Sequence, residues 1–357
     1  MEYFAFILMF SAFSLGNVAN ASRTPDKKIL FIGLVLIVTL FTGLRGIMDE
    51  YIRILNEITT LDVFLTTLNT EAIRRGYLFG LISSLILTLG GHIQTLYLVF
   101  AFTSIFLHAI YFSKFTKYYL VAFLIYMVHE MAIKEWMTIR AGLASATVLP
   151  CIYALHHNRK GRFLFWALVG GGIQYVGLLS VLIYWLRKEI RSVFLFIGLL
   201  AAIAISETGL VKELILHLDS LGVFPYAVTN YINWDGHNYK LSLFHPKIVQ
   251  QTCVLLLALY LRNRMRPDLP YFHLILNVYF LSTISFILLS DLAIFSTRIA
   301  GHFYSVEPIL IVYLGSFFVQ KRVWLSLVCF ASLLVAFINY VVLTRLEPYK
   351  MFMIPDF

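Results

Sequence analysis

The 357-residue sequence is poor in charge, since Asp, Glu, Lys and Arg together make up only 13% of it. Soluble domains carry about 25% charged residues and about 45 to 50% apolar ones, whereas 60% of this chain is hydrophobic. These proportions exclude a water-soluble fold. The 28 Lys and Arg outnumber the 19 Asp and Glu, but most of these cations form short clusters between apolar runs, the pattern that orients membrane chains. We therefore expect no nucleic-acid partner.

Cysteine is also scarce. The three residues, Cys151, Cys253 and Cys329, lie in or beside apolar runs without C-x-x-C spacing, which excludes a disulfide framework and a cysteine metal site. The histidines form neither H-x-x-x-H nor H-E-x-x-H, and the glycine motifs of phosphate-binding loops, dinucleotide folds and nucleophile elbows are missing. The sequence therefore predicts no metal, no cofactor and no ATPase or hydrolase module.

Long apolar runs dominate the chain, and a helix needs about 20 apolar residues to cross a bilayer. The runs indicate an all-α, polytopic membrane helix bundle of ten to twelve membrane segments, in a single integral-membrane domain that covers residues 1–357. The first run lacks a basic start and is interpreted as a span rather than a signal peptide. The runs lie at about residues 3–20, 29–46, 77–112, 118–133, 137–157, 163–186, 192–208, 247–262, 271–290, 298–318 and 322–344.

Six basic clusters separate these runs. Because Lys and Arg are in excess in cytoplasmic loops, all six are assigned to the cytoplasm. The outer face then receives the largest segment outside the bilayer, residues 207–246, which contains an amphipathic stretch at 210–221. The clusters are Arg23/Lys27/Lys28, Lys114/Lys117, Arg159/Lys160/Arg162, Arg187/Lys188/Arg191, Arg262/Arg264/Arg266 and Lys321/Arg322.

Two apolar regions do not fit a simple crossing. Only residues 163–186 separate Arg162 from Arg187, although both belong to cytoplasmic clusters. A broken, re-entrant hairpin is therefore expected around the glycines at 170–172, with its irregular backbone covered by protein or water. Gly90 and Gly91 similarly divide the region 77–112 into a short helix and a full span, and the sequence leaves open whether the short helix crosses.

Three arginines stand out, because ionisable residues at membrane depth are costly and are candidates for function. Arg45, Arg140 and Arg298 each interrupt an apolar run near its expected outer end, where the positive-inside rule disfavours them. Each could snorkel to lipid headgroups or pair with a nearby carboxylate. Alternatively, three guanidinium groups that face one outer cavity would bind a pyrophosphate, because their forked donors match phosphate oxygens and never lose their charge.

Carboxylates and a histidine near these arginines are candidate proton acceptors. Asp49, Glu130 and Glu135 lie close in sequence to two of the arginines, and His302 follows the third by about one helical turn. Each could equally be a structural counter-ion. Glu307 lies deeper in its expected helix and is interpreted as a paired buried carboxylate.

Four groups of short motifs follow one another in order over most of the chain: residues 41–45 with Asp49 and Tyr51, 71–76 with 90–94, 139–144, and 297–303. Together they resemble the motifs of the EpsG-like branch of the Wzy polysaccharide polymerases. Two features depart from the family pattern. Arg45 and Asp49 are only four residues apart, and Gln174 stands where the family commonly carries a histidine, so that it could not replace that histidine as a base.

The resemblance implies an integral-membrane glycosyltransferase of the GT-C type in the bacterial inner membrane, with its active site facing the periplasm. It would join repeat units of a surface polysaccharide, which are carried on undecaprenyl pyrophosphate as donor and acceptor. Membrane lipids, a chain-length regulator and a flippase are the other implied partners. In this hypothesis the pyrophosphate is clamped by Arg45, Arg140 and Arg298, Asp49 or Glu135 is the base, and His302 is a further catalytic candidate.

Other functions stay open at this point. A lipid-linked oligosaccharide flippase or other transporter commonly shows internal repeats and polar residues near the midplane, whereas this sequence has no visible repeat and its strongest charges gather toward one face. An O-antigen ligase would need the same arginines and differs only in its family motifs. A membrane O-acyltransferase would need a catalytic histidine in a supporting context, which we do not find.

Overall fold

The structure, a computed structural model, describes residues 7, 11, 14, 25–44, 60–67, 76–223, 229, 239–265, 269–317 and 320–337. Every regular element among these residues is a helix, which confirms the all-α prediction for the described part of the chain. In chain order the helices are α2 (Pro25–Gly43), α4 (Leu61–Thr67), α6 (Tyr77–Thr88), α7 (Ile93–Phe115), α8 (Tyr119–Tyr126), η1 (Met127–Met137), α9 (Ile139–Ala146), α10 (Val148–His156), α11 (Lys160–Ile173), η2 (Tyr175–Arg187), α12 (Ser192–Thr208), α13 (Leu210–Ser220), α15 (Pro246–Met265), α16 (Phe272–Leu288), α17 (Ala293–Phe303), η4 (Tyr304–Val306), α18 (Glu307–Phe317) and α19 (Lys321–Phe337).

The core of the bundle is built around α8, and all residues of this helix are buried. A helix that is apolar on every side must pack on every side, and α8 contacts α7, α18, α19 and η1. Aromatic rings interlock here: the ring centroid of Tyr126 lies 5.7 Å from that of Phe123 and 6.0 Å from that of Phe112. The continuation of α8 into η1 carries this packed core directly to the candidate site.

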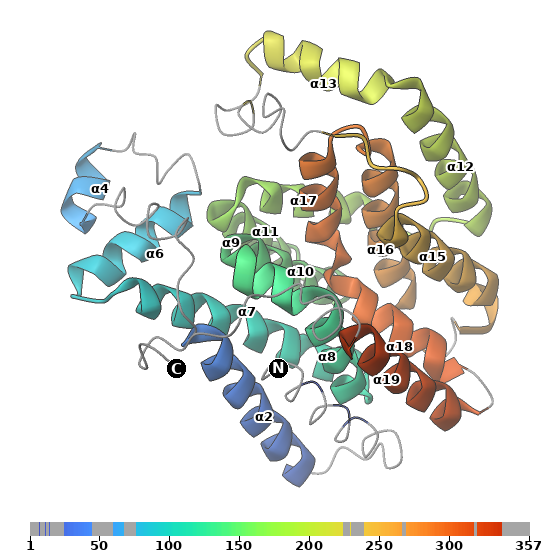
Figure 1. The fold of residues 1–357 in the computed structure, drawn as a ribbon, viewed down its shortest axis with the longest axis horizontal. Helices are drawn as coiled ribbons and strands as arrows, with labels where there is room; N and C mark the ends of the chain where they lie inside the picture. Colours follow the sequence, from blue (N-terminus) through green and yellow to red (C-terminus); the bar gives the residue numbers. More distant parts are fainter. Residues whose placement is uncertain are drawn as a thin grey trace.

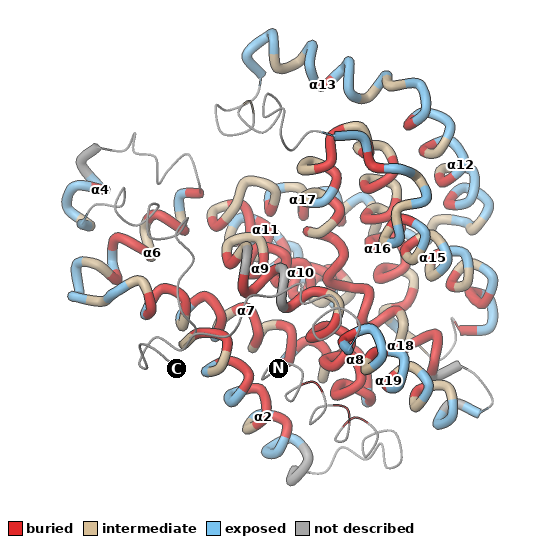
Figure 2. Tube along the Cα trace, viewed as in Figure 1, coloured by how far each residue is buried: buried red, intermediate tan, exposed pale blue. Residues whose placement is uncertain are grey.

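The outer helices present apolar side chains away from the bundle. Figure 2 shows α12 and α13 exposed along much of their length at the edge of the molecule. Phe194 and Ile197 on α12 are 61% and 54% exposed. Large apolar patches are rare on soluble monomers, so these faces are those expected of helices that contact lipid.

Two described helical stretches, Ile93–Phe115 and Ile139–His156, are long and apolar enough to cross a membrane by length and composition. The pair Ser192–Thr208 and Leu210–Ser220 would make a third, although it bends by 67° at Gly209, whose φ of +71° suits glycine. Several shorter apolar helices accompany them, including Tyr119–Met131 and Phe272–Leu288. The number of ten to twelve membrane segments, the single domain and the outer location of 207–246 stay predictions.

The expected break at Gly90 is present, whereas α11 continues through the glycines at 170–172 and the chain turns only after Ile173. α6 ends at Thr88 and α7 begins at Ile93, with Gly90 between them at φ +76°. α11 and η2 pack side by side as a helical hairpin that turns at Gln174, an extended residue with φ −151° and ψ 132°. Whether this hairpin enters and leaves the membrane on one side stays a prediction.

The two arms of the hairpin touch at a glycine. A Cβ atom added to Gly177 would lie 2.2 Å from the backbone carbon of Gly170, so Gly177→Ala must push the arms apart. We expect a loss of about 1 to 3 kcal/mol in stability, as for other overpacked sites, measured as a lower thermal unfolding midpoint in detergent. Gly161→Ala on α11 is the matched control, because no heavy atom lies within 4 Å of its new Cβ. Equal midpoints for the two variants would contradict this packing.

Four of the six basic clusters meet at one end of the bundle. Lys114 lies over the rings of Tyr111 and Tyr153, at 4.7 and 4.8 Å from their centroids. Tyr153 precedes the cluster Arg159/Lys160/Arg162, and Tyr271 follows the cluster that begins at Arg262. The two tyrosine rings stack, with 6.1 Å between their centroids. The guanidinium of Arg262 in turn donates a 2.8 Å hydrogen bond to Glu189, inside the cluster at 187–191. We call this the basic end.

Candidate active site

A cavity of about 430 Å³ opens among η1, α9, α15, α16, α17 and the turn of the α11–η2 hairpin. Its volume lies within the range of about 300 to 1,000 Å³ that is typical of small-molecule sites. The lining residues are His129, Glu130, Lys134, Thr138, Ala141, Gln174, His245, Lys247, Gln251, Phe286, Ile294, Thr297, Arg298, Ala300, Gly301, His302 and Tyr304.

The cavity lies at the end of the bundle opposite the basic end. Lys247 in the first turn of α15 lines it, whereas Arg262 in the last turn of α15 lies at the basic end. At 1.5 Å per residue, these two positions are about 22 Å apart along the helix axis. Likewise, Gln174 at the turn of the hairpin lines the cavity, while Arg162 and Arg187 stand at its far ends.

Among the described residues, three basic side chains and one carboxylate line the cavity. Lys247 places its ammonium 4.0 Å from the centroid of the Tyr304 ring, a cation–π contact that holds the long side chain in place. Lys134 forms a buried ion pair with Glu130, and Arg298 is partly buried on α17. Burial, and next the positive charge of Lys247, lower the pKa of His245 below its ordinary value. The cavity is therefore suited to an anion.

Two residues of the cavity wall each carry a buried oxygen acceptor without a described partner. Oε1 of Glu130 and Oε1 of Gln251 are buried, and neither accepts a hydrogen bond from any residue that the structure describes. Buried polar atoms nearly always have a partner, so each such atom in a native structure calls for an explanation. Both residues line the cavity, and both oxygens can only accept. Hydroxyl groups of a bound molecule would satisfy them.

Much of one wall comes from η1, which is a π-helix over Met127–Met137. π-helical turns are rare and occur frequently at functional sites, since they change which side chains share a face. In η1 they bring His129, Glu130 and Lys134 to the cavity. Glu135, although adjacent to Lys134, belongs to a different environment.

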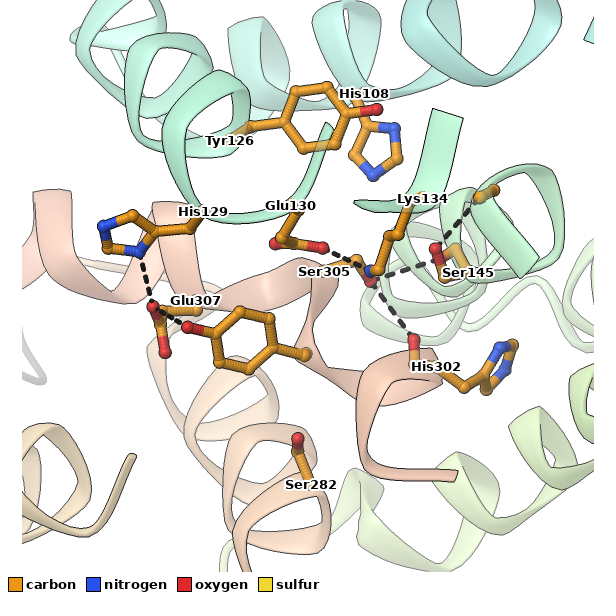
Figure 3. A network of polar contacts seen from close by, with 12 residues as sticks. His108, Tyr126, His129, Glu130, Lys134, Ser145, Ser282, His302, Ser305 and Glu307 are labelled. Atoms are coloured by element: carbon orange, nitrogen blue, oxygen red, sulfur yellow. Dashed lines mark hydrogen bonds and ion pairs between the residues drawn. The ribbon is translucent and has the colours of Figure 1, made fainter. Parts of the chain in front are cut away.

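Behind the cavity lies Glu307, whose side chain is fully buried at the first position of α18. Figure 3 shows it at the centre of a network that joins η1 to the C-terminal helices. The hydroxyl of Tyr279 donates to Oε2 at 2.7 Å, Gln250 donates to Oε1 at 2.8 Å, and the hydroxyl of Tyr304 also donates to Oε1. Nδ1 of His129 completes the set at 3.0 Å. The interpretation of Glu307 as a paired buried carboxylate is confirmed.

Three of the residues proposed from the sequence line the cavity: Glu130, Arg298 and His302. Arg298 and His302 lie one helical turn apart on α17. His302 is buried, and its Nε2 lies 2.8 Å from the hydroxyl oxygen of Ser180 on the hairpin. The predicted role of Arg298 in a pyrophosphate clamp stays a prediction.

The others are elsewhere. The guanidinium of Arg140 lies 5.1 Å from the centroid of the Phe79 ring, and the residue is not part of the cavity wall. Glu135 is buried away from the cavity, where Oε1 accepts 2.7 Å hydrogen bonds from Ser104 and Tyr126. Arg45 and Asp49 lie outside the described residues, so their predicted roles stay predictions.

The sequence analysis did not single out Lys134 and Lys247, the two other cations of the cavity. A signal was present for each: Lys134 stands four residues after Glu130 in a mainly apolar stretch, and Lys247 opens an apolar run after Pro246. Such isolated charges next to membrane segments are the kind that mark function. Neither lysine was predicted, because forked guanidinium groups alone were expected to bind phosphate oxygens.

Comparison with known proteins agrees with the motifs. The chain matches the family model described as the EpsG family over residues 28–355. It is 23% identical over 324 residues to the amylovoran biosynthesis protein AmsC of Erwinia amylovora, an alignment that covers 86% of this chain and 85% of that protein. No solved structure matches it significantly. Because the family model extends over most of the chain, this protein belongs to the EpsG family.

Proposed function

We propose that this protein is a membrane glycosyltransferase that polymerises a polysaccharide. In this proposal it joins oligosaccharide repeat units carried on undecaprenyl pyrophosphate and works at the outer face of the inner membrane. Membership in the EpsG family supports polysaccharide synthesis, as does the similarity to a protein named for amylovoran biosynthesis. The observation that carries the proposal is the cavity, in which three cations adjoin two buried acceptors without partners.

The chemistry of glycosyl transfer needs these two features. The pyrophosphate of the donor gains negative charge as the bond to the anomeric carbon breaks, and preorganised cations in a water-poor site stabilise that charge without a metal. Lys134, Lys247 and Arg298 would fill this role. Glu130 and Gln251 would accept hydrogen bonds from sugar hydroxyls and so orient the reacting units. The first turn of α15 adds the partial positive charge of a helix N-terminus beside Lys247.

The fold also supports an outward-facing site. If the clusters of the basic end lie in the cytoplasm, as the excess of Lys and Arg favours, the cavity at the opposite end of α15 opens toward the outside. Repeat units that reach the outer leaflet would meet it there. A location at one end also distinguishes this site from the midplane sites typical of transporters. A chain-length regulator and a flippase stay predicted partners.

The direct test is an extension assay with the purified protein in lipid nanodiscs. Lipid-linked repeat units should be converted into a ladder of longer glycans on the same lipid, with release of the lipid pyrophosphate. A deletion strain should accumulate single repeat units on the lipid and on its surface acceptor. Wild-type protein that binds the units but never lengthens them would contradict the proposal, and loss of all surface glycan in the strain would favour a flippase or a ligase.

A further inference from the structure

We infer that His129 is the general base that removes the proton from the acceptor hydroxyl, and that Glu307 is the positioning residue that holds it. The inference rests on the proposed function and assigns one of its steps. Among the expected bases that the structure describes, Glu130 is ion-paired, Glu135 lies away from the cavity and Nε2 of His302 contacts Ser180. His129 instead lines the cavity with its Nδ1 next to Glu307.

The pair joins the cavity to the buried network behind it. Nδ1 of His129 lies 3.0 Å from Oε1 of Glu307. The Glu307 side chain is fully buried, whereas that of His129 is 18% exposed and lines the cavity. Figure 3 shows one ring nitrogen of His129 directed at Glu307 and the other directed away from it. Because Nε2 does not contact Glu307, it is the nitrogen that we assign to the ligand.

Both oxygens of Glu307 act as hydrogen-bond acceptors. They accept hydrogen bonds from Tyr279 on α16, Gln250 on α15 and Tyr304 on η4. Nε2 of Gln250 also lies 3.4 Å from Nδ1 of His129. We assign the hydrogen between His129 and Glu307 to Nδ1, because the Glu307 oxygens already accept from the other donors. The neutral ring then has its lone pair on Nε2, the tautomer that a base in the cavity needs.

Three other candidate bases are committed to other contacts. Glu130 is ion-paired with Lys134. Nε2 of His302 is engaged by Ser180 within the buried wall. Glu135 accepts two hydroxyl hydrogen bonds away from the cavity. Of these groups, only His129 combines exposure to the cavity with a carboxylate that fixes its tautomer.

The proposed step transfers the glycan to the acceptor hydroxyl and releases the lipid pyrophosphate. Nε2 of His129 takes the proton of the acceptor hydroxyl while that oxygen forms a bond to the anomeric carbon of the donor. The bond between this carbon and the pyrophosphate oxygen breaks, and its electron pair leaves with the lipid pyrophosphate. The imidazolium then returns its proton to water, so that each turnover releases one proton, one lengthened glycan and one lipid pyrophosphate.

The test compares His129→Ala, His129→Gln and Glu307→Gln in the nanodisc extension assay, with His217→Ala on the exposed face of α13 as control. We expect kcat to fall by about 10² to 10⁴ for both His129 variants, the usual contribution of a general base. Donor binding and the KM for the donor should change little. Added imidazole should restore part of the rate to His129→Ala, since it can occupy the space and take the proton.

The kcat of Glu307→Gln should fall by a similar factor of about 10² to 10⁴. The amide that this substitution introduces can donate to Nδ1 of His129, which leaves the ring hydrogen on Nε2. Imidazole should not rescue this variant, whose His129 still fills the site. Should Glu307→Gln fail to fold, the His129 variants decide alone.

The outcomes separate the two proposals. If the wild type extends glycans and both His129 variants keep more than a third of its rate, the inference is wrong and the polymerase stands. Loss of rate together with loss of donor binding, or without rescue by imidazole, assigns His129 to binding and also overturns the inference. If the wild type binds the lipid-linked units but extends none, the proposed function itself fails.

Discussion

Replacing Lys247 by methionine should lower the rate of glycan extension by about 10² to 10³, the usual cost of removing one preorganised group that stabilises developing charge. Methionine keeps an unbranched apolar side chain but removes the ammonium that lies over the Tyr304 ring, so the main change is the loss of this charge. Because the pyrophosphate gains charge only as it departs, kcat should fall more than the affinity for the donor. Steady-state extension and donor binding in nanodiscs measure the two quantities.

Lys240→Met is the matched control for this variant. Lys240 lies shortly before α15, and its half-exposed ammonium is 3.5 Å from Glu207 and 3.6 Å from Asp291, outside the cavity wall. Exposed pairs of this kind contribute only about 0 to 1 kcal/mol to stability, so this variant should extend glycans at nearly the wild-type rate. A similar loss of rate in both lysine variants would show that the effect is not local to the cavity.

Variants of Arg298 and Arg140 should behave differently in the same extension assay. Arg298→Ala should behave like Lys247→Met, and Arg298→Lys should recover only part of the rate, because a point charge does not replace a fork that binds two oxygens. Arg140, which lies against Phe79 rather than in the cavity wall, provides the comparison. If Arg140→Ala lost donor binding, Arg140 would belong to the pyrophosphate-binding set that the sequence predicted.

Lys134→Met should lower the free energy of unfolding by about 3 to 5 kcal/mol, because it leaves the buried charge of Glu130 without its partner. Both residues are almost completely buried, with exposed fractions of 7% for Lys134 and 2% for Glu130. The ion pair also joins neighbouring turns of η1, so its loss should loosen the π-helix that forms one cavity wall. The thermal unfolding midpoint in detergent measures the change.

The double variant Lys134→Met, Glu130→Gln provides the internal check. Removing both charges together eliminates the unpaired carboxylate, and replacement of a complete buried pair by neutral groups is often tolerated. We expect the double variant to regain at least half of the stability lost by Lys134→Met, while its extension activity stays low. If the double variant lost as much stability as Lys134→Met and Glu130→Gln lose together, the two side chains would not stabilise each other.

Some features of the protein follow from composition and local order alone. The shortage of charge and the long apolar runs predicted a helical membrane protein, and every regular element that the structure describes is a helix. Gly90 and Gly91 predicted the break between α6 and α7, whereas the turn of the α11–η2 hairpin lies at Gln174, just after the glycines at which it was expected. The ordered short motifs predicted the family. These properties depend on the transfer of apolar side chains out of water and on the conformational freedom of the backbone. Both are properties of a single segment of the chain.

The membership of the cavity was decided only by the tertiary structure. Lys134 and Glu135 are adjacent in sequence, yet one lines the cavity and the other is buried against α7. Adjacent side chains of a helix point to different sides, and only the packing of the neighbouring helices decides what each side meets. His129 and Glu307 are 178 residues apart. Their contact depends on how α18 packs against the core around α8, and helix packing is a property of pairs of surfaces rather than of one segment.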